Sequence, residues 1–125
     1  PLFPPESTGN LPLEYFIAEV IREKVFATTY QEVPQETAVE VEEIGPGTSR
    51  PEILVIRARI IVGREHLKGM LIGASGAKIK TIGRRAREEI EAFTGRKVYL
   101  DLKVDVIPDW RNRPDVFRRF GYGSL

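Results

Sequence analysis

Residues 71–82 read Leu-Ile-Gly-Ala-Ser-Gly-Ala-Lys-Ile-Lys-Thr-Ile, two apolar helical patterns joined by a four-residue turn that begins and ends with glycine. Glycine accepts a positive φ angle and has no Cβ to keep a ligand away from the backbone. A helix that begins after Gly76 leaves its first N–H groups without partners, and with the helix dipole they form a site for an anion. Because glycines are also common at helix ends, the spacing alone favours a turn without a ligand. The apolar flanks, the position between two helices and the basic residues nearby favour the anion site instead.

On both sides of this turn, apolar residues follow the period of an amphipathic helix. Residues 65–72 predict a short helix, and residues 77–93 predict a longer one that Gly95 is well placed to end. A further helix is predicted near the start of the chain, with Pro12 in its first turn and its end near Thr29. The apolar side of the helix over 77–93 is expected to consist of Ile79, Ile82, Ala86, Ile90 and Phe93.

Three segments alternate apolar and polar residues, as strands with one buried face do. They are residues 37–44, 52–62 and 97–106. The first two flank a loop rich in Gly and Pro, so we expect them to form a hairpin. The resulting order is helix, strand, strand, helix, helix, strand, and the sheet needs a helical layer over its apolar face. The fold class is therefore α+β, a two-layer sandwich.

The ends of the chain differ in composition from its middle. Residues 1–10 are rich in Pro, Ser and Gly and are interpreted as a linker or arm. Residues 11–107 are expected to form the folded domain, and residues 108–125 a tail that packs on it, with a short helix opened by Pro114. Because the chain starts at Pro1 without a Met, we expect an excised or processed piece of a longer protein.

Charge is distributed unevenly along a chain whose net charge is only +1. Residues 1–52 carry three basic and ten acidic side chains, a net of −7, whereas residues 64–87 carry seven basic side chains and one acidic one, a net of +6. A single basic block in a nearly neutral chain indicates a localised site for a polyanion. A solvated helix face is the alternative that charge alone leaves open.

The composition and motifs of the chain argue against several kinds of catalytic, metal and nucleotide site. The chain has no Cys, which excludes thiol catalysis and thiolate metal sites, and its single His, His66, makes zinc binding a poor fit. No stretch approaches the roughly 18 apolar residues of a membrane span, and the start lacks the pattern of a signal peptide. The P-loop pattern Gly-x-x-x-x-Gly-Lys-Ser/Thr is absent, so we expect no GTP binding through such a loop.

Two alternatives to a polyanion site follow from other features. Residues 73–77 resemble the turn that carries the nucleophile of serine hydrolases, but that turn follows a strand, and here a helix is predicted before Ser75. The only candidate base, His66, lies on that same helix and is interpreted as a solvated surface residue. A protein-interaction module is the second alternative, through the acidic first helix or the aromatic tail. Within the tail, Trp110 is expected to pack on the domain rather than stack on a base.

The pattern Leu-Ile-Gly-x-x-Gly-x-x-Ile over residues 71–79 resembles the signature of KH domains, whose Gly-x-x-Gly loop clamps four nucleotides. The order of helices and strands is that of the type II, bacterial arrangement. From about residue 11 to residue 122 the chain also resembles the C-terminal KH domain of the Era family of GTPases. The segments that carry this resemblance are Ala-Glu-Val-Ile-Arg-Glu-Lys (18–24), Gln-Glu-Val-Pro (31–34), Ala-Val-Glu-Val-Glu (38–42), Lys-Val-Tyr-Leu-Asp-Leu (97–102) and Pro-Asp-Trp-Arg (108–111).

The resemblance implies a domain that binds single-stranded RNA, in particular the 3′ end of small-subunit ribosomal RNA, and acts in small-subunit assembly. It implies a GTPase domain with GTP and magnesium elsewhere in the full protein, and neither enzyme activity nor a cofactor in this chain. A monomer is expected, in the cytoplasm and with peripheral membrane contact for the full protein. The expected RNA site comprises Lys68, Ile72, Gly73, Ala74, Ser75, Gly76, Lys78, Ile79, Lys80 and Arg84.

The loop departs from its relatives at the first variable position. Related loops often carry Lys there, whereas this chain has Ala74 followed by Ser75. The backbone N–H groups remain, but a side-chain cation for a phosphate is lost. We expect this change to affect the affinity for RNA rather than the mode of binding.

Overall fold

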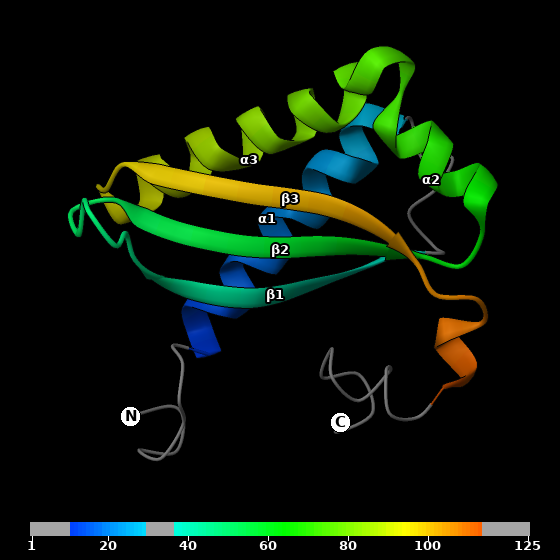
Figure 1. Ribbon diagram of the computed structural model, residues 1–125, viewed down its shortest axis with the longest axis horizontal. Coiled ribbons are helices and arrows are strands. Elements are labelled where there is room, and N and C mark those ends of the chain that lie inside the picture. Colours follow the sequence, from blue (N-terminus) through cyan, green and yellow to red (C-terminus); the bar gives the residue numbers. More distant parts are fainter. Residues whose placement is uncertain (1–10, 30–36, 114–125) are drawn as a thin grey trace.

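The computed structural model describes residues 11–29 and 37–113. The helices and strands follow the predicted order, which is confirmed (Figure 1). The expected arm at residues 1–10 and the helix at Pro114 lie outside the described residues. The elements are α1 (Leu11–Thr29), β1 (Thr37–Pro46), β2 (Leu54–Val62), α2 (Glu65–Ile72), the 3-10 turn η2 (Ala74–Gly76), α3 (Ala77–Thr94), β3 (Val98–Val106) and the 3-10 turn η3 (Trp110–Asn112).

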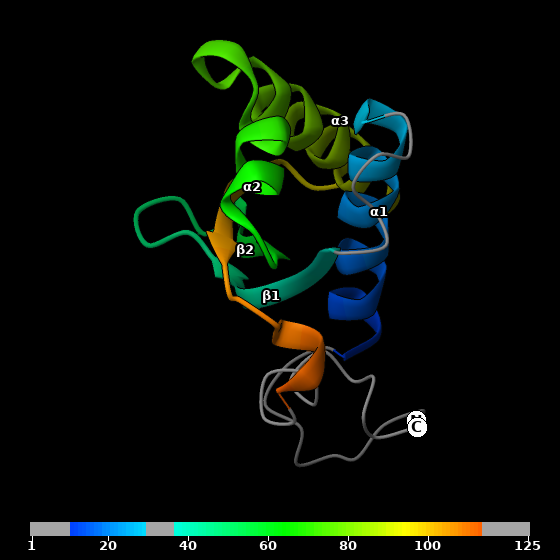
Figure 2. The ribbon, with the colours of Figure 1, turned by 90° about the vertical axis from the view of Figure 1, so that its right-hand side faces the viewer.

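The strands form a mixed sheet in the order β1-β2-β3. β1 and β2 are antiparallel, as expected for a hairpin, whereas β2 and β3 are parallel. Parallel neighbours need a crossover, which α2 and α3 supply on one side of the sheet (Figure 2). Ile60 of the central strand pairs with Val39 on one side and Val104 on the other, so apolar residues of all three strands share the covered face.

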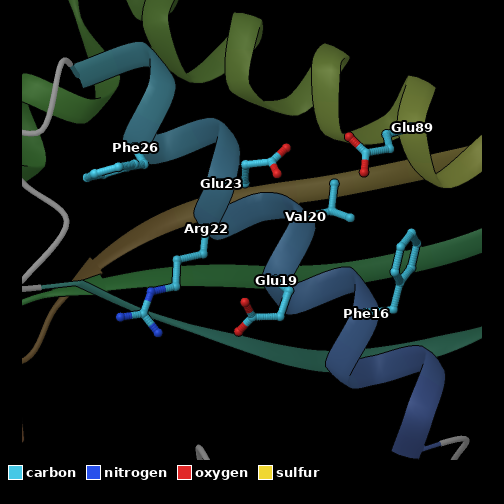
Figure 3. A pocket seen from close by; sticks show the side chains of 7 residues that line it. All are labelled: Phe16, Glu19, Val20, Arg22, Glu23, Phe26 and Glu89. Atoms are coloured by element: carbon cyan, nitrogen blue, oxygen red, sulfur yellow. The ribbon is translucent and has the colours of Figure 1, made fainter.

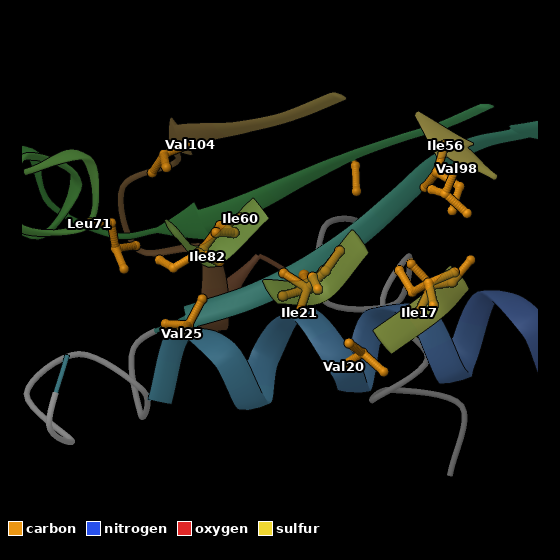
Figure 4. Close-up of a cluster of buried hydrophobic side chains, with 14 of the residues drawn as sticks. Ile17, Val20, Ile21, Val25, Ile56, Ile60, Leu71, Ile82, Val98 and Val104 are labelled. Carbon is orange, nitrogen blue, oxygen red and sulfur yellow. The ribbon is translucent and has the colours of Figure 1, made fainter. Parts of the chain in front are cut away.

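The core lies between this covered face and the helices (Figure 4). The predicted stripe of α3 is confirmed for Ile82, Ala86 and Ile90, which are fully buried, while Ile79 is half-buried at the edge of the core. Burying an aliphatic side chain of this kind stabilises a fold by about 1.5–3 kcal/mol, so the stripe holds α3 firmly on the sheet. The large side chains enclosed completely include Ile17, Ile21, Val25, Ile56, Ile60, Val62 and Leu71.

The prediction that Phe93 belongs to this core is wrong. Phe93 is 66% exposed and stacks on Phe16 of α1, with 4.1 Å between the ring centroids. It lies one residue before the end of α3, on the side of the helix that faces α1. The two rings therefore connect the outer surfaces of α1 and α3.

The face of the sheet away from the helices is polar. Arg59 donates hydrogen bonds to Glu40 at 2.7 Å and to Asp105 at 3.0 Å, and so links all three strands. Burial alone lowers the pKa of Arg59, but the hydrogen bonds to Asp105 and Glu40 outweigh it and raise the pKa above its usual value. Arg57 donates to Asp101 at 2.8 Å farther along the same face.

Trp110 covers one end of the polar face. Its side chain is 4% exposed and packs with Ala38 and Ile61, which are paired across β1 and β2. The expectation that Trp110 packs on the domain is confirmed, while the tail beyond residue 113 lies outside the described residues. Separately, none of the helices in the described ranges is long and apolar enough to cross a lipid bilayer.

Candidate nucleic-acid interface

The turn between α2 and α3 has a backbone that few side chains tolerate. Gly73 has φ 73° and ψ 177°, and Gly76 has φ 76° and ψ 14°. Between them, Ser75 also has a positive φ of 55°. Three positive φ angles among four residues reverse the chain tightly, which brings the end of α2 next to the beginning of α3.

The hydrogen bonds of the turn leave two of its backbone N–H groups without a backbone partner. Gly73 donates to the Gly69 carbonyl at 3.0 Å, Gly76 donates to Gly73 at 3.2 Å, and Ala77 donates to Ala74. These bonds do not use the N–H groups of Ala74 and Ser75, and both residues are exposed. At the N-terminus of the 18-residue helix α3, such donors suit an anion.

The two glycines meet different constraints. A Cβ added at Gly73 would lie 2.8 Å from the Cβ of Lys78, whereas one added at Gly76 would meet nothing within 4 Å. Gly73 is therefore required by close packing and by its backbone angles. Gly76 is required by its backbone angle alone, and the space beside it is open to a ligand.

The remaining expected site residues surround the turn unevenly. Ile72 and Ile79 are half-buried on its two flanks and offer apolar surface for bases. Lys68 is half-buried on α2, while Lys80 is exposed on α3. Among the described residues, Lys68, Lys78 and Lys80 form no ion pair, so their charges are available to a polyanion.

One group of basic residues lies on the side of α3 that faces α1. Glu89 marks this side because it accepts a hydrogen bond from Lys24 of α1 at 2.6 Å. Lys78 precedes Glu89 by eleven positions, which is about three helical turns, and Arg85 precedes it by about one turn. Lys78 and Arg85 therefore point toward α1 and away from β3.

A second group lies on the side of α3 that faces β3. Glu91 marks that side because it accepts the N–H of Val98, the first residue of β3, at 2.9 Å. Lys80, Arg84 and Arg87 precede Glu91 by about three, two and one turns. The structure thus brings Lys80 and Arg84 together, and it separates them from Lys78, although the three were expected in one site.

Two residues of this β3-facing side were not included in the expected site. Arg87 continues the row and forms an ion pair with Glu91 at 3.2 Å. Gly83 is half-exposed, and a Cβ there would meet nothing within 4 Å, so it leaves space beside the row. The sequence indicates Gly83 and Arg87 through their spacing, because Lys80, then Gly83 or Arg84, and then Arg87 follow Gly76 at steps of three or four residues.

A hollow of about 640 Å³ lies elsewhere, on the outer surface of α1 (Figure 3). It is lined by Phe16, Glu19, Val20, Arg22, Glu23, Phe26 and Glu89. Lys24 bridges two of the carboxylates, with 2.7 Å to Glu23 and 2.6 Å to Glu89. The hydrogen bonds to Glu23 and Glu89 raise the pKa of Lys24 above its usual value. The carboxylates make this hollow a poor site for phosphates.

The structure does not favour the hydrolase alternative. Ser75 follows the helix α2, not a strand, so the strand-to-helix turn of a nucleophile is not formed. His66 is exposed on α2, as expected for a surface residue. Within residues 11–29 and 37–113, no three His, Cys, Asp or Glu side chains gather as metal ligands.

Comparison with known proteins identifies the family of this chain. Residues 32–111 match the KH domain family. GTPase Era of Aquifex aeolicus is 51% identical over 122 residues, which are 98% of this chain and 40% of that protein. GTPase Era of Thermotoga maritima is 51% identical over 112 residues, which are 89% of this chain and 36% of that protein. The chain thus spans about two-fifths of the length of these relatives.

Two solved structures of Era cover 98% of this chain and 40% of their own chains at 51% identity. One is a variant of Aquifex aeolicus Era bound to GDP and AlF4−, with a TM-score of 0.84. The other is Era in complex with MgGDPNP and nucleotides 1506–1542 of 16S ribosomal RNA, with a TM-score of 0.85. The expected resemblance is confirmed, and this chain belongs to the KH domain family, in the form found in GTPase Era.

Proposed function

We propose that this domain binds single-stranded RNA at the turn of residues 73–76. The observation that carries the proposal is the backbone of the turn, in which the N–H groups of the exposed residues Ala74 and Ser75, just before α3, have no backbone partner among the described residues. A phosphate of the RNA backbone accepts these hydrogen bonds, and the neighbouring bases lie on the apolar flank formed by Ile72 and Ile79. A narrow site of this kind needs splayed bases, which a duplex does not offer.

The RNA we propose is the 3′ end of small-subunit ribosomal RNA, within a longer protein of the Era family that acts in small-subunit assembly. The support is the Era structure that holds nucleotides 1506–1542 of 16S ribosomal RNA, to which this chain is 51% identical. The basic row on the β3-facing side of α3 supports it further, because it continues from the turn along one line. The small ribosomal subunit and the GTPase domain are then the partners of this domain.

We further propose that this chain acts by binding and not by catalysis, with GTP and magnesium left to the GTPase domain. The absence of a P-loop pattern from the sequence supports this division. A cytoplasmic location with peripheral membrane contact of the full protein stays a prediction from the family resemblance, as does the monomeric state.

A fluorescence anisotropy titration with a labelled single strand of this RNA end and with its duplex tests the proposal. The single strand should bind more tightly, and affinity should fall with rising salt. In the variant Ala74→Asp with Ser75→Asp, two carboxylates stand where the phosphate binds, so affinity should fall roughly tenfold or more.

The matched control is Thr48→Asp with Ser49→Asp, which puts the same two charges in the exposed hairpin loop at the other end of the sheet (Figure 1). This control should bind a single strand of about four nucleotides nearly as well as the unchanged domain, because so short a strand does not extend from the turn to that end of the sheet. A folded Ala74→Asp, Ser75→Asp variant with undiminished affinity, or equal affinity for the duplex, would contradict the proposal.

A further inference from the structure

Tyr99 is an exposed aromatic residue on an edge strand. It lies on β3, which among residues 11–29 and 37–113 pairs with β2 alone, and its side chain is 55% exposed. Val98 on one side of it in the chain is buried, so Tyr99 points to the opposite, polar face of the sheet. A base can therefore approach its ring from the open edge.

Two basic residues precede Tyr99, and Asp101, which follows it on the same face, is paired with Arg57 at 2.8 Å. Lys97 is exposed and lies two residues before Tyr99 on the same face, and Arg96 precedes it in the loop. Neither forms an ion pair with another described residue; Arg96 only donates a long hydrogen bond of 3.5 Å to the carbonyl of Pro51. Tyr15 on α1 is 67% exposed but has Glu14 and Glu19 near it in the helix. Of these two exposed tyrosines, Tyr99 is the one preceded by basic residues that form no ion pair with another described residue.

Basic side chains of α3 lead from the turn toward Tyr99. They are Lys80, Arg84 and Arg87, of which Arg84 pairs with Glu88 at 3.6 Å and Arg87 with Glu91 at 3.2 Å. Half-buried Leu100 and Leu102 of β3 lie next to that side of the helix and give it an apolar floor. The row ends at the hydrogen bond between Glu91 and Val98, directly before Tyr99. α3 and β3 lie closest where α3 ends and β3 begins, and they splay apart toward the turn (Figure 1).

We propose that RNA bound at the turn continues along α3 and over the edge of β3, where Tyr99 stacks on an unpaired base and Lys97 and Arg96 contact its phosphates. This inference rests on the proposed binding at the turn and adds a second contact at the other end of α3. Because α3 is about 27 Å long, a strand that reaches both contacts must exceed the roughly four nucleotides clamped by a KH loop.

The test compares two unstructured RNAs, one of about four nucleotides and one of about twelve. Tyr99→Ala should weaken binding of the longer RNA about tenfold, within the range for losing one base–aromatic stack, and leave the shorter RNA unaffected. Tyr99→Phe should bind both RNAs as the unchanged domain does, because the ring is kept. Arg96→Gln with Lys97→Gln should lower the salt slope for the longer RNA by roughly 1.4 and not that for the shorter one.

Tyr15→Ala is the matched control, and it should leave both RNAs unaffected. Unchanged binding of the longer RNA by Tyr99→Ala would overturn the proposal, and so would an equal loss for both RNAs or an equal effect of Tyr15→Ala. The binding at the turn is judged separately: it fails if the Ala74→Asp, Ser75→Asp variant binds the shorter RNA normally. Circular dichroism of each variant verifies that the domain is folded.

Discussion

Gly73 and Lys78 approach each other so closely that a Cβ on Gly73 would lie 2.8 Å from the Cβ of Lys78 and 3.1 Å from its backbone nitrogen. The contact joins the last turn of α2 to the first turn of α3. It fixes the direction in which the N-terminus of α3 points, and with it the N–H groups offered to an RNA phosphate. The glycine is therefore part of the binding geometry although it contributes no side chain.

This contact predicts unequal effects of adding one methyl group to the two glycines of the turn. Gly73→Ala should lower the free energy of unfolding by roughly 2–4 kcal/mol, because it adds a clash to a backbone conformation suited only to glycine. Gly76→Ala should cost only about 1 kcal/mol, because its left-handed backbone is strained but the space is open. Urea denaturation of both variants measures the difference. An equal loss of unfolding free energy in the two variants would show that Lys78 moves aside at little cost.

The ion pairs of Lys24 predict a dependence of stability on alkaline pH. Because the folded-state pKa of Lys24 is raised above 10.5, the unfolded chain loses this proton first as the pH increases. The contribution of Lys24 should therefore be complete below about pH 10.5 and be lost as the pH rises through the folded-state pKa. Lys24→Met should be less stable at neutral pH, and the gap to the unchanged domain should narrow above pH 10.5. Urea denaturation across that range measures the gap, and a constant gap would contradict the prediction.

The exposed ring stack of Phe93 on Phe16 predicts that Phe93 contributes less to the free energy of unfolding than its size suggests. Phe93→Ala should cost about 1 kcal/mol, as for the loss of one exposed ring pair with Phe16. Ile90→Ala, one turn earlier in α3, should cost roughly 2–5 kcal/mol, because Ile90 is fully buried. Thermal or urea denaturation of the two variants gives the comparison. A larger loss for Phe93→Ala would mean that its ring is enclosed by groups other than Phe16.

The elements that the sequence predicts well are those with a strong period and a bounding glycine. Residues 77–93 have both, and α3 ends at Thr94 with Gly95 in the left-handed conformation. Phe93 follows the same period but lies outside the core. The period predicts the direction of a side chain, but it does not tell whether another element covers that side chain, and Phe93 remains 66% exposed. The pattern of residues 97–106 predicts a strand but not its partner. That β3 pairs in parallel with β2 depends on the crossover through α2 and α3.

In the candidate site, too, the sequence predicts one part and not another. The turn could be recognised because two glycines at fixed spacing between helices leave few backbone arrangements. The grouping of Lys78 with Lys80 came from their proximity in sequence, but two positions in a helix differ by about 200° in direction. Which of the two faces β3 depends on how α3 packs, and the hydrogen bonds of Glu89 and Glu91 reveal it.

The last prediction concerns the cation that the turn lacks, and the change is Ala74→Lys. Ala74 is exposed and lies at the first variable position of the turn, where the backbone already offers donors to a phosphate. An added ammonium group should neutralise about one more phosphate and steepen the salt slope by roughly 0.7. Affinity should rise by about 1 kcal/mol at low salt, and equally for unrelated sequences, because phosphate contacts carry no sequence information.

The control for Ala74→Lys is Ala92→Lys, which places the same charge at an exposed position about 22 Å farther along α3. Anisotropy titrations of both variants use two unrelated single strands of about four nucleotides, which are too short to extend from the turn to the far end of α3. Across a series of salt concentrations, they separate a local contact from a general gain in charge. A gain limited to Ala74→Lys means that a phosphate passes within reach of the first variable position. If Ala92→Lys gains as much, or if Ala74→Lys changes neither affinity nor slope, the RNA backbone does not pass Ala74, and the placement of RNA on this turn is wrong.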